Sequence, residues 1–360
     1  MKKYFIIALV FISSCQKNIT DQPGTINVKG EILYISTRII NNNPVPQMFV
    51  MNADGTNQRL IFDKPAGPPV LSHSKKKIVF TTNENSYACL YTIDIDGQNL
   101  KFLNKTKYSS FSPALSPDDS KITFVIRDTI PPYDCNIYTI NADGTNRIQL
   151  TNQYDNVSPL YLPDNSAIIY TSRNGTMSGV YKMNVDGTNK QLLSPPGKSF
   201  SVSSISPNGK MIAINSEDWN GSQIFVMNTD GSNLKQLTFT VEKNYNDTGS
   251  PRGGNNEPVW SPNSSRIVYH SYENTAHDIY VINADGSGNK RLTDSPLRDQ
   301  CPAWTDDGRY IIYASKKGWY SGNTPTYGAW VISIMTADGQ SKTELTNNIG
   351  GDFYPVFIPK

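Results

Sequence analysis

One short sequence motif occurs seven times along the chain. Each copy is a strand-like apolar segment followed by Asp-Gly, and successive copies lie 42, 47, 43, 44, 55 and 53 residues apart. Glycine tolerates the left-handed backbone of a tight hairpin, so each copy predicts a turn between two antiparallel strands. Repeats of about 40–50 residues built from short strands are typical of a β-propeller. The seven pairs are Asp54-Gly55, Asp96-Gly97, Asp143-Gly144, Asp186-Gly187, Asp230-Gly231, Asp285-Gly286 and Asp338-Gly339.

Four strand-like segments follow one another in the same order within each repeat. The first begins with proline, as at residues 258–261, and the second is β-branched and aromatic, as at residues 266–269. The third precedes the Asp-Gly turn and the fourth follows it. Residues 31–35 match the second type and residues 354–358 the first, so the repeat is out of phase with the chain ends. We therefore expect an all-β, seven-bladed β-propeller of four-stranded antiparallel blades over residues 30–360, closed by pairing of the N- and C-terminal strands in one blade.

Residues 1–14 have the features of a lipoprotein signal peptide. Two lysines precede an apolar run at residues 4–12, which is shorter than the about 20 residues that span a bilayer. The run ends in Ile12-Ser13-Ser14-Cys15, which resembles a bacterial lipobox and implies that Cys15 is lipidated. Residues 15–29 then form a polar tether, and Gln16 favours the outer membrane, with the domain facing the periplasm or the cell surface. The alternative is an ordinary cleaved signal peptide whose cysteine has no role.

Charge and cysteine content limit the possible partners. The 33 Lys and Arg residues include the two lysines of the signal peptide, so a mature chain has 31 basic and 31 acidic side chains. This balance predicts no nucleic-acid partner, because nucleic-acid binding needs a clustered basic surface. The remaining cysteines are Cys89, Cys135 and Cys301. We expect three small buried thiols, with a disulfide between Cys89 and Cys135 as the alternative.

The two rims of the predicted disc differ in their loops. The variable rim carries the connections between blades and the loops from second to third strands, which differ in length and composition. The uniform rim carries the short first-to-second and third-to-fourth turns. Three long segments of the variable rim, at residues 240–257, 270–277 and 315–329, fall on neighbouring blades, and binding residues often lie in such loops.

Aromatic and cationic side chains in these three segments are candidates to bind a partner protein or a glycan. Tyr, Trp and Arg often anchor interfaces, and aromatic rings equally suit stacking on a sugar. The alternative is that the rings pack only against their own loops. The candidates are Lys243, Tyr245, Arg252, Tyr272, Trp319, Tyr320 and Tyr327.

A second set of polar residues recurs three places before the proline of the first strand or its equivalent. We expect this polar collar at the mouth of the central channel, where it is suited to hold water, a cation or ligand hydroxyls. The alternative is that these side chains bond to neighbouring backbone groups and tie the blades together. The collar comprises Ser110, Asn156, Ser201, Asn255, Asp299 and Asp352.

The chain contains only three histidines. His73 lies in a predicted turn of the uniform rim, whereas His270 and His277 flank one loop of the variable rim. A transition-metal site usually needs three or four ligands, so we expect no metal and no cofactor.

Three phrases resemble the WD40-like repeats of the TolB-type β-propeller family. They are Trp260-Ser261-Pro262-Asn263, Trp304-Thr305-Asp306-Asp307-Gly308 and the segment at residues 279–286. The resemblance covers nearly all of the mature chain. It implies a relationship to periplasmic proteins that bind other envelope proteins, to propeller domains of serine peptidases and to oligogalacturonate lyases, which use a histidine-rich manganese site. The Gly-x-Ser-x-Gly elbow does not occur in the sequence, and three histidines are few for that manganese site.

Together these features predict a non-catalytic, lipid-anchored cell-envelope binding protein that recognises a protein or a glycan through the variable rim. The membrane contact is expected through the lipid anchor alone. The alternative is a polysaccharide-active enzyme of the oligogalacturonate-lyase type.

Overall fold

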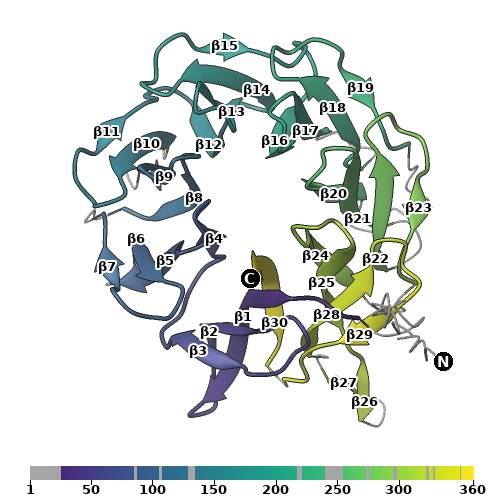
Figure 1. The fold of residues 1–360 in the computed structure, drawn as a ribbon. Coiled ribbons are helices and arrows are strands. Elements are labelled where there is room, and N and C mark those ends of the chain that lie inside the picture. The colour runs from purple at the N-terminus through teal and green to yellow at the C-terminus, as the bar shows by residue number, and fades with distance from the viewer. Residues whose placement is uncertain are drawn as a thin grey trace, which may run out of the picture.

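The computed structural model describes residues 26–84, 87–104, 108–128, 134–216, 221–239, 254–272, 276–294, 298–321, 324–326, 329–348 and 350–360. Within these ranges the regular elements are strands, and no helix is long and apolar enough to cross a lipid bilayer. Seven four-stranded antiparallel sheets stand around a central channel as the blades of a closed ring (Figure 1). The predicted all-β, seven-bladed propeller is confirmed.

The innermost and second strands of the blades lie nearest the channel. The innermost strands are β4 (Val70–Leu71), β8 (Ser110–Leu115), β12 (Asp155–Tyr161), β16 (Phe200–Ile205), β20 (Gly254–Trp260), β24 (Asp299–Trp304) and β30 (Asp352–Pro359). The second strands are β5 (Lys77–Glu84), β9 (Lys121–Arg127), β13 (Ala167–Asn174), β17 (Met211–Ser216), β21 (Arg266–Tyr272), β25 (Tyr310–Lys316) and β1 (Gly30–Ile40).

The third and fourth strands complete each blade toward the circumference. The third strands are β6 (Tyr87–Asp94), β10 (Cys135–Asn141), β14 (Met177–Asn184), β18 (Ile224–Asn228), β22 (His277–Asn283), β28 (Trp330–Thr336) and β2 (Asn43–Asn52). The fourth strands are β7 (Lys101–Phe102), β11 (Ile148–Gln149), β15 (Gln191–Leu192), β19 (Lys235–Gln236), β23 (Lys290–Arg291), β29 (Lys342–Glu344) and β3 (Arg59–Phe62). A small additional hairpin, β26 (Trp319–Ser321) with β27 (Thr324–Thr326), lies between β25 and β28.

The two ends of the chain meet in one blade, as the phase of the repeat predicts. This blade has the strand order β3-β2-β1-β30, so three strands come from the N-terminal part and one from the C-terminus. In the register of β1 with β30, Leu33 lies opposite Val356 and Ile32 opposite Phe357. The β1 edge, which is otherwise open to pairing with another chain, is therefore covered within the molecule.

The hydrophobic core consists of seven clusters, each built from two adjacent blades. In one of them Trp304, at the end of β24, packs with Val268 of the preceding blade. Because both faces of each sheet are covered, second strands are apolar without alternation, as shown by the complete burial of Ile78, Val79 and Phe80 in β5. Seven interfaces for seven blades close the ring.

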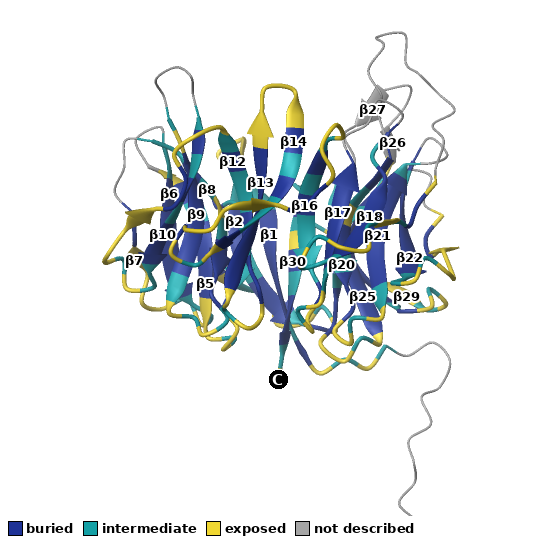
Figure 2. Cartoon of the chain, turned by 90° about the horizontal axis from the view of Figure 1, so that it is seen from above, coloured by how far each residue is buried: buried dark blue, intermediate teal, exposed yellow. Residues whose placement is uncertain are grey.

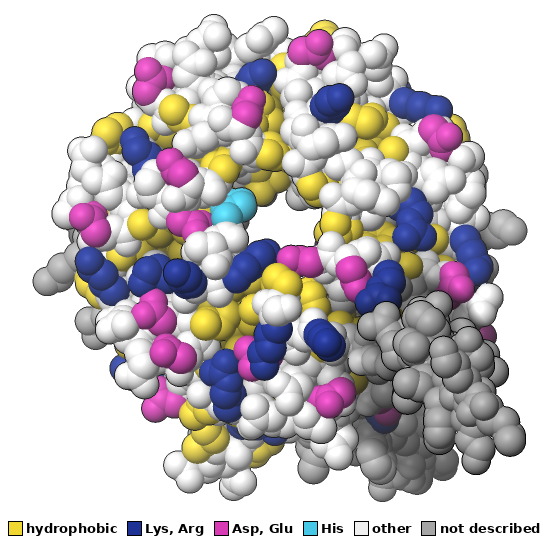
Figure 3. Space-filling view, in the orientation of Figure 1, with side chains coloured by type: hydrophobic (Ala, Val, Ile, Leu, Met, Phe, Trp, Pro, Cys, Tyr) yellow, Lys and Arg dark blue, Asp and Glu magenta, His cyan; other side chains and the backbone are white. Residues whose placement is uncertain are grey.

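The two rims differ as expected from the loops. The tip of the hairpin between β13 and β14 is formed by exposed residues and lies on the upper rim in Figure 2. The C-terminus lies at the lower rim, together with the short turns. The upper rim is thus the variable rim and the lower one the uniform rim. On the face in view in Figure 3, basic and acidic side chains are interspersed around the channel opening.

Candidate functional site

The turns of the uniform rim use their polar groups internally. In the first Asp-Gly turn, Asp54 Oδ1 accepts hydrogen bonds from the backbone N of Thr56 at 3.0 Å and from its hydroxyl at 2.6 Å. Gly55 has a φ of 85°, which a Cβ would disfavour. The same aspartate-to-hydroxyl bond recurs at Asp143, Asp186 and Asp230. These hydrogen bonds satisfy the polar groups of the turns themselves, so a binding site is expected on the variable rim.

Four of the candidates on the variable rim and the lipidation candidate lie outside the described residues. They are Lys243, Tyr245, Arg252, Tyr327 and Cys15. Trp319 and Tyr320 form β26, where they pair with Thr326 and Pro325 of β27. The ring of Tyr272, at the end of β21, lies 5.0 Å from that of His277. The binding role of all of these residues stays a prediction.

The structure brings the ends of the loop at residues 270–277 together, with the two histidine rings 5.2 Å apart. His270 is buried, and its Nδ1 lies 3.3 Å from Glu257 Oε2. Burial, followed by the charges of His270 and Arg298, lowers the pKa of His277 to about 4, so His277 is neutral at pH 7. Within the described ranges no three His, Cys, Asp or Glu residues are grouped so that they could hold a metal ion.

The collar residues begin the innermost strands, and five of the six are buried, Ser201 being half-buried. Several hydrogen-bond to the preceding blade or to the connection that leads from it. Asn104 Nδ2 donates to Ser110 Oγ at 3.0 Å, and Asn255 Nδ2 donates to Gln223 Oε1 of the preceding blade at 3.1 Å. Burial raises the pKa of Asp299, against hydrogen bonds from Ser315 and Thr293 that lower it.

Asp352 completes this arrangement in the closing blade. Burial raises the pKa of its carboxyl group, against hydrogen bonds from Ser36, Thr346 and Asn348 that lower it. Asn348 Nδ2 donates both to Asp352 Oδ1, at 3.3 Å, and to the carbonyl oxygen of Thr37, at 2.8 Å. These contacts link the chain ends, which favours the alternative in which the collar ties the blades together. A ligand-binding role for the collar stays a prediction.

Other residues of the innermost strands are more exposed, and five of these strands, β8, β12, β20, β24 and β30, carry a β-bulge at their proline. The residue before the proline has a positive φ at Ser112, Ser158, Glu257, Cys301 and Tyr354. A bulge interrupts the alternation of sides along a strand, so the collar position and this bulge position do not share a face. Sequence reasoning missed these bulge residues, although their place directly before the proline marks them.

Three bulge residues on consecutive blades are neighbours. Glu257 Oε2 accepts a hydrogen bond from the backbone N of Cys301 at 3.1 Å. Burial, followed by the charge of Glu257, raises the pKa of the Cys301 thiol, which also lies near Tyr354. A thiol with a raised pKa stays protonated at neutral pH, which makes it a poor nucleophile. Cys89 and Cys135 are buried thiols that are not joined to each other.

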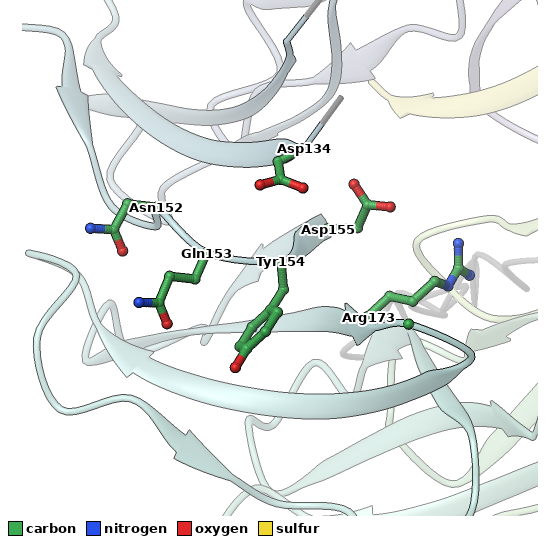
Figure 4. Close-up of a pocket in the computed structure, with 7 residues that line it drawn as sticks. Asp134, Asn152, Gln153, Tyr154, Asp155 and Arg173 are labelled. Atoms are coloured by element: carbon green, nitrogen blue, oxygen red, sulfur yellow. The ribbon is translucent and has the colours of Figure 1, made fainter. Parts of the chain in front are cut away.

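A hollow of about 640 Å³ lies between the blade of β8–β11 and the blade of β12–β15 (Figure 4). Its volume is in the range of ligand pockets, about 300–1,000 Å³. Sequence reasoning missed it, because its residues come from three separate segments that only blade packing brings together. The lining residues are Asp134, Asn152, Gln153, Tyr154, Asp155, Arg173 and Gly175.

Comparison with known proteins places the chain in a family. The model of the TolB beta propeller domain matches residues 16–253, which is more than half of the chain. The chain belongs to the TolB β-propeller family. A TolB homolog of Chlorobaculum tepidum is 27% identical over 121 residues, which are 34% of this chain and 27% of that protein. Another curated relative, from Agrobacterium fabrum, is matched over 30% of its length. The chain therefore spans less than a third of these relatives.

Solved structures of this propeller type share the fold at low sequence identity. TolB from Acinetobacter baumannii has a TM-score of 0.54 and 16% identity, with 95% of this chain and 89% of that chain covered. An oligogalacturonate lyase from Vibrio parahaemolyticus has a TM-score of 0.59 and 12% identity, with 80% and 95% covered. These likenesses support the TolB-type propeller fold and do not distinguish a binding protein from an enzyme.

Proposed function

We propose that this TolB-type propeller is a non-catalytic, lipid-anchored binding protein of the bacterial cell envelope that recognises a protein or a glycan through its variable rim. The observation that carries this proposal is the contrast between the rims. Turns of the uniform rim satisfy their own polar groups, as Asp54 does with Thr56. The variable rim instead presents loops of different length and a hollow with polar lining. Family membership adds support for an envelope role.

The absence of catalysis is part of the proposal. His270, which faces the Glu257 carboxylate on the variable rim, is buried, and its side chain is only 9% exposed, which limits contact with a substrate. The pKa of the nearby Cys301 thiol is raised, which disfavours a thiolate nucleophile. The burial of His270 favours a binding protein over the carbohydrate-active enzyme, and the protonated Cys301 thiol argues against thiolate chemistry at the same place.

The binding role is tested by retention of envelope components on the immobilised full chain. Trp319→Ala with Tyr320→Ala is expected to reduce retention about tenfold, because truncating an aromatic anchor typically costs more than 1 kcal/mol. Leu100→Ala with Phe102→Ala, at exposed residues in and before the outer strand β7, is the matched control and should leave retention unchanged. Unchanged retention by the Trp319 and Tyr320 variant would reject this site. Turnover of oligogalacturonate together with a stoichiometric transition metal would instead support the enzyme.

The lipid anchor has its own test in Cys15→Ser. The lipobox-like end of the signal peptide supports lipidation at the Cys15 thiol, which serine cannot replace chemically. One acyl chain binds membranes only marginally, whereas several chains anchor stably, so the variant should move from the membrane fraction to the soluble fraction. Parent chain and variant are compared by fractionation and by mass spectrometry of the N-terminal peptide. A variant that remains with the membrane, or a parent chain without lipid, contradicts the anchor.

A further inference from the structure

The hollow lies between the blade of β8–β11, here called the second blade, and the blade of β12–β15, called the third blade, and it is built from segments that the fold holds in place. Asp134 directly precedes β10, Asn152 to Asp155 connect the two blades, and Arg173 lies at the end of β13 (Figure 4). Asp155 Oδ1 accepts a hydrogen bond from the backbone N of Cys135 at 3.0 Å, which fixes this carboxylate across the blade boundary. Arg173 lies opposite Asp155 in the register of β12 with β13, and its Nε donates to Ser178 Oγ at 3.1 Å.

Tyr154 has an unusual backbone conformation in this hollow. Its φ is 65°, a region that bulky side chains rarely adopt, and 46% of the residue is exposed to solvent. The buried side chain of Asn156 maintains this conformation, since its Nδ2 donates to the carbonyl oxygens of Gln153 at 2.5 Å and Tyr154 at 3.0 Å. Backbone strain of this kind persists only where the surroundings enforce it, and it is found preferentially at functional sites. Here the enforced conformation keeps an aromatic ring at the edge of the hollow.

The lining limits the chemistry of a ligand. Two carboxylates, one guanidinium and two amides offer both acceptors and donors within one hollow. An anionic ligand would be repelled by the carboxylates of Asp134 and Asp155, and a cationic ligand would be repelled by the guanidinium group of Arg173. Hydroxyl groups donate to carboxylates and accept from guanidinium and amide groups, so a neutral polyhydroxylated ligand satisfies the whole set. The exposed Tyr154 ring supplies an apolar platform for the C–H face of a sugar ring.

We infer that the hollow between the second and third blades binds an uncharged oligosaccharide, stacked on Tyr154 and hydrogen-bonded to Asp134, Asp155 and Arg173. This inference rests on the proposed binding role of the variable rim and names a ligand class for it. The site is distinct from the aromatic candidates on β26, which lie on another blade.

The test is saturation-transfer difference NMR on the full chain, purified without sugar-based detergents. The neutral probes are maltohexaose, cellohexaose, laminarihexaose, mannohexaose and hexa-N-acetylchitohexaose, with hexagalacturonate and an oligolysine peptide as charged probes. At least one neutral probe should bind to the parent chain and to Tyr154→Phe. Tyr154→Gly should lower the affinity about tenfold, the order expected for one aromatic contact.

Tyr154→Gly separates binding from folding, because glycine adopts the positive φ without strain. Its melting temperature should stay close to that of the parent chain, because the strain relieved at this position offsets the greater backbone entropy of glycine in the unfolded chain. Met177→Ala is the matched control and should bind as the parent does, because Met177 is exposed on the same β13–β14 hairpin but is not one of the lining residues. The inference is overturned if no neutral probe binds, if only a charged probe binds, or if Tyr154→Gly binds as the parent does.

The outcome for the hollow is separable from that for the proposed function. If Trp319 and Tyr320 are needed for retention of envelope components while no neutral sugar binds, the ligand class is wrong and the binding role stands. If a neutral sugar binds at Tyr154 and is cleaved, the site stands and the non-catalytic role is wrong.

Discussion

At the scale of single residues, each turn of the uniform rim depends on one short side chain. Asp118 Oδ1 accepts hydrogen bonds from Ser116 Oγ at 2.6 Å and from the backbone N of Ser120 at 3.0 Å. In an equivalent turn Asn208 takes this place and accepts from Ser206 Oγ at 2.8 Å. The chain itself therefore shows that the turn needs the acceptor oxygen and not the charge. The charge matters for the dependence of stability on pH.

We predict that Asp118→Asn makes the protein less sensitive to acid. Hydrogen bonds from Ser116 and Ser120 lower the pKa of Asp118 to about 2, below the value of about 4 that aspartate has in an unfolded chain. The unfolded state then takes up the proton first, so the stability from this group is complete above pH 4 and is lost as the pH falls toward 2. Because Asp118 is exposed, its carboxylate should contribute less than about 1 kcal/mol to the free energy of unfolding.

The measurement is urea unfolding of the parent chain and of Asp118→Asn at pH 7 and pH 3. The loss of unfolding free energy between the two pH values should be smaller in the variant, and the variant should be slightly less stable at pH 7. An equal loss in both proteins would show that the Asp118 carboxylate contributes nothing to the acid sensitivity.

At the scale of elements, a hydroxyl after the fourth strand caps the third strand of the same blade. Thr151, Thr238, Thr293 and Thr346 each accept a hydrogen bond at 2.9 Å from the backbone N of a buried residue in the third strand. Ser194 does the same for Val180 at 3.1 Å. The Leu-Thr ending of the repeat thus satisfies a backbone group that the fourth strand is too short to reach.

We predict that Thr293→Val destabilises the protein by about 1–3 kcal/mol, the cost of leaving a buried donor without an acceptor. Thr293 is 3% exposed and accepts from the backbone N of Ile279, so water has little access to replace the hydroxyl. Thr293→Ser is the matched control, since serine already has this role at position 194. Chemical unfolding measures both; equal stability of the valine and serine variants would contradict the capping role.

The elements were predictable from the sequence to the extent that they repeat. Proline, Asp-Gly and the β-branched strands mark each blade, and the phase of the repeat at residues 31–35 and 354–358 indicates the closing blade. The hollow was not predictable, because Asp134 and Arg173 lie at the ends of loops that no repeated sequence motif marks. Burial of the collar was also not foreseen, because the bulge at the proline of five innermost strands breaks the alternation of sides.

At the scale of the whole molecule, β30 holds the ring closed. Phe357 packs into the hydrophobic cluster that contains Ile32 and Tyr34. Ile358 packs into the cluster on the other side of the same blade, which contains Ile78. One C-terminal strand thus contributes to two of the seven interfaces between blades. Without it both interfaces lose apolar contacts and the β1 edge is open. The variable rim exists as one continuous face only because this blade is complete.

Deletion of residues 353–360, measured by thermal unfolding, therefore tests directly whether the C-terminal strand closes the seven-bladed ring. We expect the truncated chain to lose its cooperative transition, because two interfaces of the ring are incomplete. Deletion of Lys360 alone is the control; it removes the ion pair of this exposed lysine with Glu31, at 3.2 Å, while Glu31 keeps its contact with Arg59, and the melting temperature should stay nearly unchanged. A chain without residues 353–360 that melts cooperatively at the temperature of the parent would contradict the closed ring.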